Sequence, residues 1–145
     1  MCNSDSSDTD VVAGIHRLAA FAQDEDNCSR IAYCGGYLAV IQIMESRLQS
    51  TSVQGGCCSA LWTFAMDDDQ NQQAIRDMGG MQAIVTAMTT HPDCESLQMK
   101  ACGVLDTLID DDISSHICSK FRQSGGIQAV VNVMDTFPDA AKLRK

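Results

Sequence analysis

Cysteine and histidine are the residues of this chain best suited to nucleophilic catalysis, and the sequence holds eight cysteines and three histidines in 145 residues. A cysteine nucleophile needs a base beside it, but no spacing gives the histidines a cysteine or carboxylate partner. Cys57 and Cys58 could form a reactive pair at a helix start, where the helix dipole lowers a thiol pKa. Since Cys58 recurs 44 residues later as Cys102, on an apolar stripe, packed and reduced thiols are the better interpretation. We therefore expect no enzyme, and a thiol-dependent enzyme is the least favoured function.

Metal binding finds little support in the spacing. No C-x-x-C pair occurs, and only His116 and Cys118 stand at near-ligand spacing, whereas zinc normally takes two close pairs. A calcium loop beginning at Asp67 would have Gln72 at its sixth position and Met78 at its twelfth, where Gly and Glu are required. We predict no metal and no cofactor.

Acidic residues give the clearest chemical signal, because they gather in three triplets at 24–26, 67–69 and 110–112. The triplets hold nine of the nineteen acids, and the other ten balance the ten Lys and Arg, so the net charge of -9 belongs to the triplets. Aligned like charges attract a basic partner and speed its association. Nucleic acid is not expected, because the basic residues form no stripe. Helix capping is the alternative role for these acids. The acids included in the predicted partner-binding site are Asp67, Asp68, Asp69, Asp110, Asp111 and Asp112.

Composition favours an all-α protein, since apolar residues make up 45% of the chain, aromatic residues only 5%, and Gly and Pro number ten and two. The first ten residues, MCNSDSSDTD, are polar and acidic, which predicts a disordered leader rather than a signal peptide. No apolar run is long enough to span a bilayer, so we expect no membrane insertion. The expected location is cytoplasmic, or nuclear.

An internal repeat of about 44 residues organises the rest of the chain. Segments 79–98 and 125–144 are similar, with Met88 matched by Met134 after a two-residue insertion before Gly125. Each period contains a short segment, a Gly-Gly pair, an apolar-periodic segment and a longer third one, which predicts three helices. The first glycine of each pair should adopt the left-handed conformation that ends a helix. The pairs are Gly35–Gly36, Gly79–Gly80 and Gly125–Gly126.

The repeat resembles that of the armadillo family, which includes importin alpha and beta-catenin. The resemblance rests on the motif N-x-x-x-I-x-x-x-G-G, here Asn71 to Gly80, and on the stretch ACGVLDTLI at 101–109. It implies a right-handed α-solenoid of three-helix repeats over residues 11–145, and HEAT repeats, with two helices each, are the nearest competitor. The expected parts are a leader (1–10), a lone third helix (11–23), two full repeats (27–66 and 71–109) and a truncated repeat (113–145).

The resemblance also implies that the third helices line a concave groove for a partner segment. Importin-like members hold an extended peptide with a Trp and, four residues later, an Asn. The corresponding pairs here are His16 and Ala20, Ser59 and Thr63, and Gly103 and Thr107, so no repeat keeps the motif. Trp62, the only tryptophan, is either a core residue or an exposed anchor for a partner. The groove residues of the predicted site are Gln54, Ser59, Trp62, Thr63, Gln98, Asp106 and Thr107, with Gln54 and Gln98 bonding a ligand's main chain.

These observations predict a non-catalytic scaffold for protein–protein interaction. Its expected partner is a protein or peptide segment, which it binds through the concave groove and the acidic edge. This edge is the line along which stacked repeats would align the three acid triplets, at the junctions between units, and its charge favours a basic partner. The alternative is an importin-like adaptor for basic cargo signals, which the acids favour and the missing Trp–Asn pairs oppose. The sequence leaves the oligomeric state open.

Overall fold

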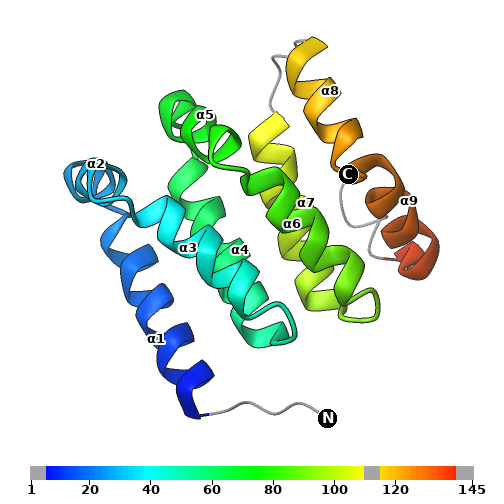
Figure 1. Ribbon diagram of the computed structural model, residues 1–145, viewed down its shortest axis with the longest axis horizontal. Coiled ribbons are helices and arrows are strands. Elements are labelled where there is room, and N and C mark those ends of the chain that lie inside the picture. Colours follow the sequence, from blue (N-terminus) through cyan, green and yellow to red (C-terminus); the bar gives the residue numbers. More distant parts are fainter. Residues whose placement is uncertain (1–5, 110–114, 140–145) are drawn as a thin grey trace.

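The computed structural model describes residues 6–109 and 115–139. Over these residues every regular element is a helix, so the predicted all-α class is confirmed. Figure 1 shows α1 at one edge of the molecule and α8 and α9 at the opposite edge. The helices are α1 (Ser6–Phe21), α2 (Glu25–Tyr33), α3 (Gly36–Ser46), α4 (Thr51–Ala65), α5 (Asp69–Asp77), α6 (Gly80–Thr90), α7 (Glu95–Ile109), α8 (Ser115–Gln123) and α9 (Gly126–Thr136).

The expected three-helix unit appears twice in full, as α2–α3–α4 and α5–α6–α7. Its corner is the Gly-Gly pair, where Gly79 has φ 84° and adopts the left-handed conformation that glycine tolerates best. A β-carbon on Gly80 would lie 2.8 Å from the carbonyl oxygen of Ile75, so only glycine lets α6 begin so close to the end of α5. The predicted helix–Gly-Gly–helix corner is therefore confirmed.

The acids of two triplets begin the first helix of their units. Asp24 accepts hydrogen bonds from the backbone N–H groups of Asp26 and Asn27, at 2.9 and 3.3 Å, and so caps α2. Asp68 accepts one from the N–H of Asn71 at 2.9 Å and caps α5. Because one carboxylate per triplet is enough for the cap, the neighbouring acids remain free for another role.

Successive units pack side by side. The third helix α4 lies between α1 and α7, and the second helices α3, α6 and α9 follow one another in the same way. The core runs through all of these layers, and in it the rings of Tyr37 and Phe64 stack with centroids 4.9 Å apart. None of the described helices combines the length and the apolar character that crossing a bilayer requires.

The start of the chain departs from the expectation of a disordered leader over residues 1–10, because α1 begins at Ser6. Residues 1–5 lie outside the described part. Asp8 is buried and pairs with the guanidinium of Arg47, which also donates to the hydroxyl of Ser7 at 2.9 Å. Arg47 is 39 and 40 residues from Asp8 and Ser7 along the chain. Its contacts therefore hold the acidic first turn of α1 on the first unit.

Candidate functional site

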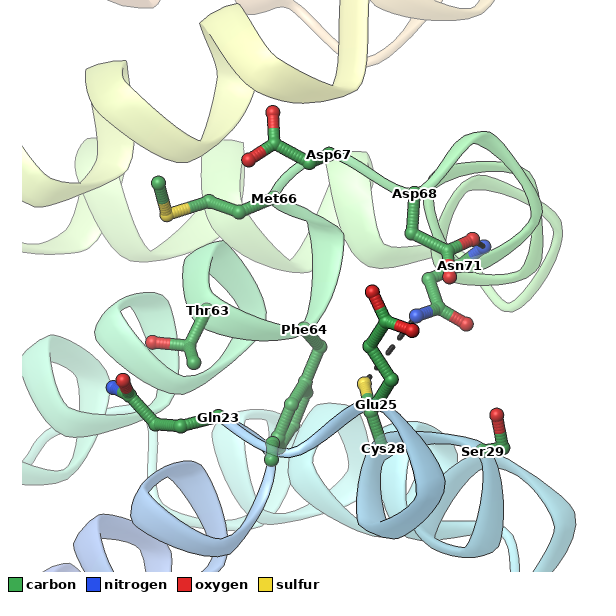
Figure 2. Close-up of a pocket in the computed structure, with 11 residues that line it drawn as sticks. Gln23, Glu25, Cys28, Ser29, Thr63, Phe64, Met66, Asp67, Asp68 and Asn71 are labelled. Carbon is green, nitrogen blue, oxygen red and sulfur yellow. Dashed lines mark hydrogen bonds between the residues drawn. The ribbon is translucent and has the colours of Figure 1, made fainter.

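A pocket of about 530 Å³ opens where the first full unit meets the second (Figure 2). One wall comes from the α1–α2 link and from α2, and the other from the end of α4, the α4–α5 link and the start of α5. The units meet here because each third helix ends in a short link that carries the cap of the next unit. The residues labelled in the pocket are Gln23, Glu25, Cys28, Ser29, Thr63, Phe64, Met66, Asp67, Asp68 and Asn71.

The pocket is acidic. Glu25 reaches from α2 toward the link that carries Asp67 and Asp68, so three carboxylates line it while no Lys or Arg does. Asp68 is engaged as the cap of α5. Glu25 and Asp67 are exposed, and within the described residues neither carboxylate has a hydrogen-bond or ion-pair partner. Unpaired carboxylates beside a hollow attract cations and basic side chains.

Hydrogen bonds to sulfur hold the floor of the pocket. The side-chain amide of Asn71 donates to Cys28 Sγ at 3.3 Å, as the dashed line in Figure 2 marks. Cys28 Sγ also lies 3.3 Å from the hydroxyl of Tyr37. Burial raises the pKa of Tyr37, and its hydrogen bond with Cys28 raises it further. The network joins α2, α3 and α5, so the pocket has a fixed floor.

Only some of the predicted groove residues on the third helices line the pocket. Thr63 lines the pocket, whereas Ser59, Trp62 and Thr107 do not. The hydroxyl of Thr63 donates to the carbonyl of Ser59, and that of Thr107 to the carbonyl of Gly103, both at 3.1 Å. These hydroxyls are satisfied within their own helices. Trp62 is 37% exposed, and its ring lies against Gly103, so it is partly packed and partly open to solvent.

The remaining acids of the predicted site lie apart from the pocket or outside the described residues. Asp106 is exposed on α7, and Asp69 is the exposed first residue of α5. Neither lines the pocket. Asp110, Asp111 and Asp112 lie outside the described residues, so the alignment of all three triplets along one edge stays a prediction.

The expectation that Gln54 and Gln98 contact a ligand is wrong, because both side chains are buried. Nε2 of Gln54 donates to the carbonyls of Met44 and Arg47 at 2.8 and 3.0 Å, at the end of α3. Gln98 makes the same pair of bonds at the end of α6, at 2.9 and 2.8 Å. The last carbonyls of a helix lack partners inside it. The third helix folds back along the second, and its glutamine supplies the missing donor.

The packing role predicted for the cysteines is confirmed for Cys58 and Cys102, whereas Cys34 and Cys118 are exposed. The described ones are free thiols, and Cys57, Cys58 and Cys102 are buried. Burial raises the pKa of Cys57 to about 12, and burial together with the neighbouring Cys57 raises that of Cys58 to about 12. A protonated, buried thiol is a poor nucleophile. Across residues 6–109 and 115–139, no three His, Cys, Asp or Glu side chains are grouped to hold a metal ion.

Of the residues that line the pocket, the predicted site includes only Thr63, Asp67 and Asp68. Glu25 belongs to the first acid triplet, but the predicted site took triplet acids only from the other two. Asn71 is predicted only as part of the repeat motif, and Met66 is not in the predicted site. No local sequence pattern marks this pocket, because its walls come together only in the folded chain. The pocket joins α2 of one unit to the start of α5 in the next, about 43 residues further along the chain.

Comparisons of this chain with protein-family models, with curated protein sequences and with solved structures found no match. Its function is therefore inferred from its own residues. They provide an acidic pocket, a partly exposed tryptophan next to the lining residue Thr63 on α4, and a set of buried thiols.

Proposed function

We propose that this chain is a non-catalytic protein-interaction scaffold of the armadillo type, a right-handed α-solenoid that binds a basic segment of a partner protein. The repeated three-helix units and their side-by-side packing support this fold assignment. The observation that carries the binding proposal is the pocket, which Glu25 and Asp67 line without a basic partner among the described residues.

The pocket suits a Lys or Arg side chain. A guanidinium or ammonium group can form charge-assisted hydrogen bonds with Glu25 and Asp67. Met66 is 56% exposed on the same rim and offers an apolar surface for the methylene stem. The segment would continue along α4 toward Trp62, and the exposed Asp106 on α7 could attract a second basic residue.

The adaptor alternative is weaker. Basic cargo signals would suit the acidic pocket, but an importin-like clamp needs a side-chain amide that both donates and accepts. Thr63 and Thr107 stand at the amide positions, and their hydroxyls are already bonded within their helices. A thiol-dependent enzyme is weaker still, because the raised pKa of Cys57 and Cys58 keeps both thiols protonated.

The test is peptide binding measured by fluorescence anisotropy. The probe is a labelled peptide of alternating lysine and serine, and its matched competitor has glutamine in place of lysine. We expect saturable binding of the lysine peptide only, and the double variant Glu25→Gln/Asp67→Asn should weaken it about tenfold.

The control is Asp93→Asn/Glu95→Gln, which removes the same two charges from exposed positions outside the pocket. Glu95 begins α7 as Glu25 begins α2, so the effect on the helix dipole is matched. This control should change affinity less than twofold or so. Equal losses in both variants would show diffuse charge attraction and would refute a pocket.

A further inference from the structure

An exposed apolar stripe runs along α9. Ile127, Val131 and Met134 are 54%, 42% and 54% exposed. Their spacing of four and three residues places them on one face of the helix. Large apolar side chains that share one face of a helix and remain open to solvent mark a surface that another element covers.

The same positions are buried in the other two units. Residues at these repeat positions are at most 4% exposed in α6 and at most 1% exposed in α3. The apolar face of α9 is therefore built like a core face. The equivalent residues are Met81, Val85 and Met88 in α6, and Tyr37, Ile41 and Met44 in α3.

In the full units a third helix covers this face together with the following unit. A β-carbon on Gly125 would lie 4.0 Å from Val85 Cγ1, and Met44 lines a hollow with Gln82, Ala83 and Thr86 of α6. Helix α4 packs along α3, and α7 packs along α6. The stacked rings of Tyr37 and Phe64 are one such contact, between α3 and α4. Helix α9 lies at the edge of the molecule and is the last described helix, so within the described residues nothing takes the place of α4 or α7 (Figure 1).

The end of α9 carries a second, polar feature of the same interface. In the full units the buried Gln54 and Gln98 donate to two carbonyls at the end of the second helix. The equivalent carbonyls in α9 are those of Met134 and Phe137. No glutamine of the described chain stands beside them. Among residues 6–109 and 115–139 the face thus has neither an apolar cover nor a donor to these two carbonyls.

Helix α1 of a second copy of this chain would not be a suitable cover for the apolar face of α9. By the 43-residue step that relates α1 to α4, Asp10 and Arg17 correspond to the buried Val53 and Ala60. Both charged residues are exposed on α1. Docking α1 on α9 would bury them, and burying charges without a built set of partners is costly.

We propose that the apolar face of α9 is the docking surface for an amphipathic helix of a partner protein, one with the residue pattern of α4 and α7. That pattern is an apolar residue followed by Gln in the first turn, then small and apolar residues at helical spacing. The apolar residues cover Ile127, Val131 and Met134, and the glutamine amide donates to the carbonyls of Met134 and Phe137. This surface continues the α3–α4 and α6–α7 interfaces and is independent of the acidic pocket.

The test adds to the full chain a labelled synthetic peptide with the sequence of α7 and the change Cys102→Ala. Anisotropy should show saturable binding. Val131→Asp in the protein should weaken it about tenfold, whereas Asn132→Asp, on the opposite side of α9, should change it less than about twofold. In the peptide, Gln98→Leu should weaken binding about fivefold although it makes the peptide more apolar.

Circular dichroism and Trp62 emission show whether each protein variant keeps its fold, and the peptide variant tests the proposal without changing the protein. Absent binding, binding unaffected by Val131→Asp, or tighter binding of the Gln98→Leu peptide would each overturn the proposal. Self-association in sedimentation experiments that Val131→Asp abolishes would assign the face to a second copy and would also overturn it.

Discussion

The indole ring of Trp62 lies directly on Gly103, where a β-carbon at position 103 would come within 2.6 Å of its Cη2 atom. The contact joins the third helices α4 and α7 of neighbouring units. It holds a large aromatic side chain at the surface with 37% of it exposed. Glycine at this position therefore fixes where the only tryptophan of the chain stands.

Replacing Gly103 by alanine should displace the ring. Alanine gains about 1 kcal/mol over glycine in a helix, but overpacking costs about 1–3 kcal/mol. We expect the free energy of unfolding to fall by about 1 kcal/mol in urea titrations. Trp62 emission should move to longer wavelength as the ring becomes more exposed.

Gly56→Ala is the matched control, because a β-carbon there meets no atom closer than 3.7 Å. Gly56 lies within α4, so alanine should stabilise the chain by about 1 kcal/mol and leave the emission unchanged. If Gly103→Ala stabilised the chain as much as Gly56→Ala, the ring would not be held in this way.

The three-helix unit could be predicted from sequence because its signals are local. A Gly-Gly pair, an acidic cap and apolar spacing each act within a few residues. The role of Gln98 could not be predicted, because a glutamine on a third helix reads equally as a groove residue or a buried donor. Only the packing of α7 along α6 decides between them.

Gln98→Leu should destabilise the fold. The substitution removes the donor to the carbonyls of Met88 and His91 and leaves both without it. A buried polar group without a partner costs about 1–3 kcal/mol, so we expect a loss of that size in urea titrations. Gln42→Ala, at an exposed position of α3, should change stability by less than about 0.5 kcal/mol. Equal effects of the two changes would contradict the buried hydrogen bonds.

Stability should fall at alkaline pH. Burial raises the pKa of Cys57 and Cys58 from 9.0 to about 12, so the folded chain keeps protons that the unfolded chain releases. The stability that the two protonated thiols contribute is fully present below about pH 9. It is lost as pH rises from there toward 12. Between about pH 8 and 9.5 the loss should be about 1 kcal/mol per thiol.

The measurement is urea unfolding with a reductant present at both pH values. The control is Cys57→Ala/Cys58→Ala, which should show a smaller loss than the unsubstituted chain over the same pH interval. An equal loss in both proteins would assign the pH dependence to other groups, such as the buried Tyr37, whose pKa is also raised.

The acidic pocket shows the other limit of sequence reasoning. The triplets predicted negative charge at the junctions between units, and the structure adds that Glu25, Asp67 and Asp68 line one hollow. That Asp68 is the cap while Asp67 is free depends on backbone geometry, because Asp67 has φ 56° and the chain turns there. Three identical aspartates in a row give no local signal for this division.

The salt dependence of basic-peptide binding tests the central claim most directly. Exposed charges are screened beyond about 8 Å at physiological ionic strength, so a pocket that binds through Glu25 and Asp67 should lose affinity steeply with salt. Anisotropy titrations with the lysine–serine peptide between about 50 and 500 mM NaCl should show a loss of at least about tenfold. The slope should be much smaller in Glu25→Gln/Asp67→Asn and unchanged in Asp93→Asn/Glu95→Gln. Affinity that is independent of salt, or an equal slope in all three proteins, would contradict a basic partner bound at this pocket.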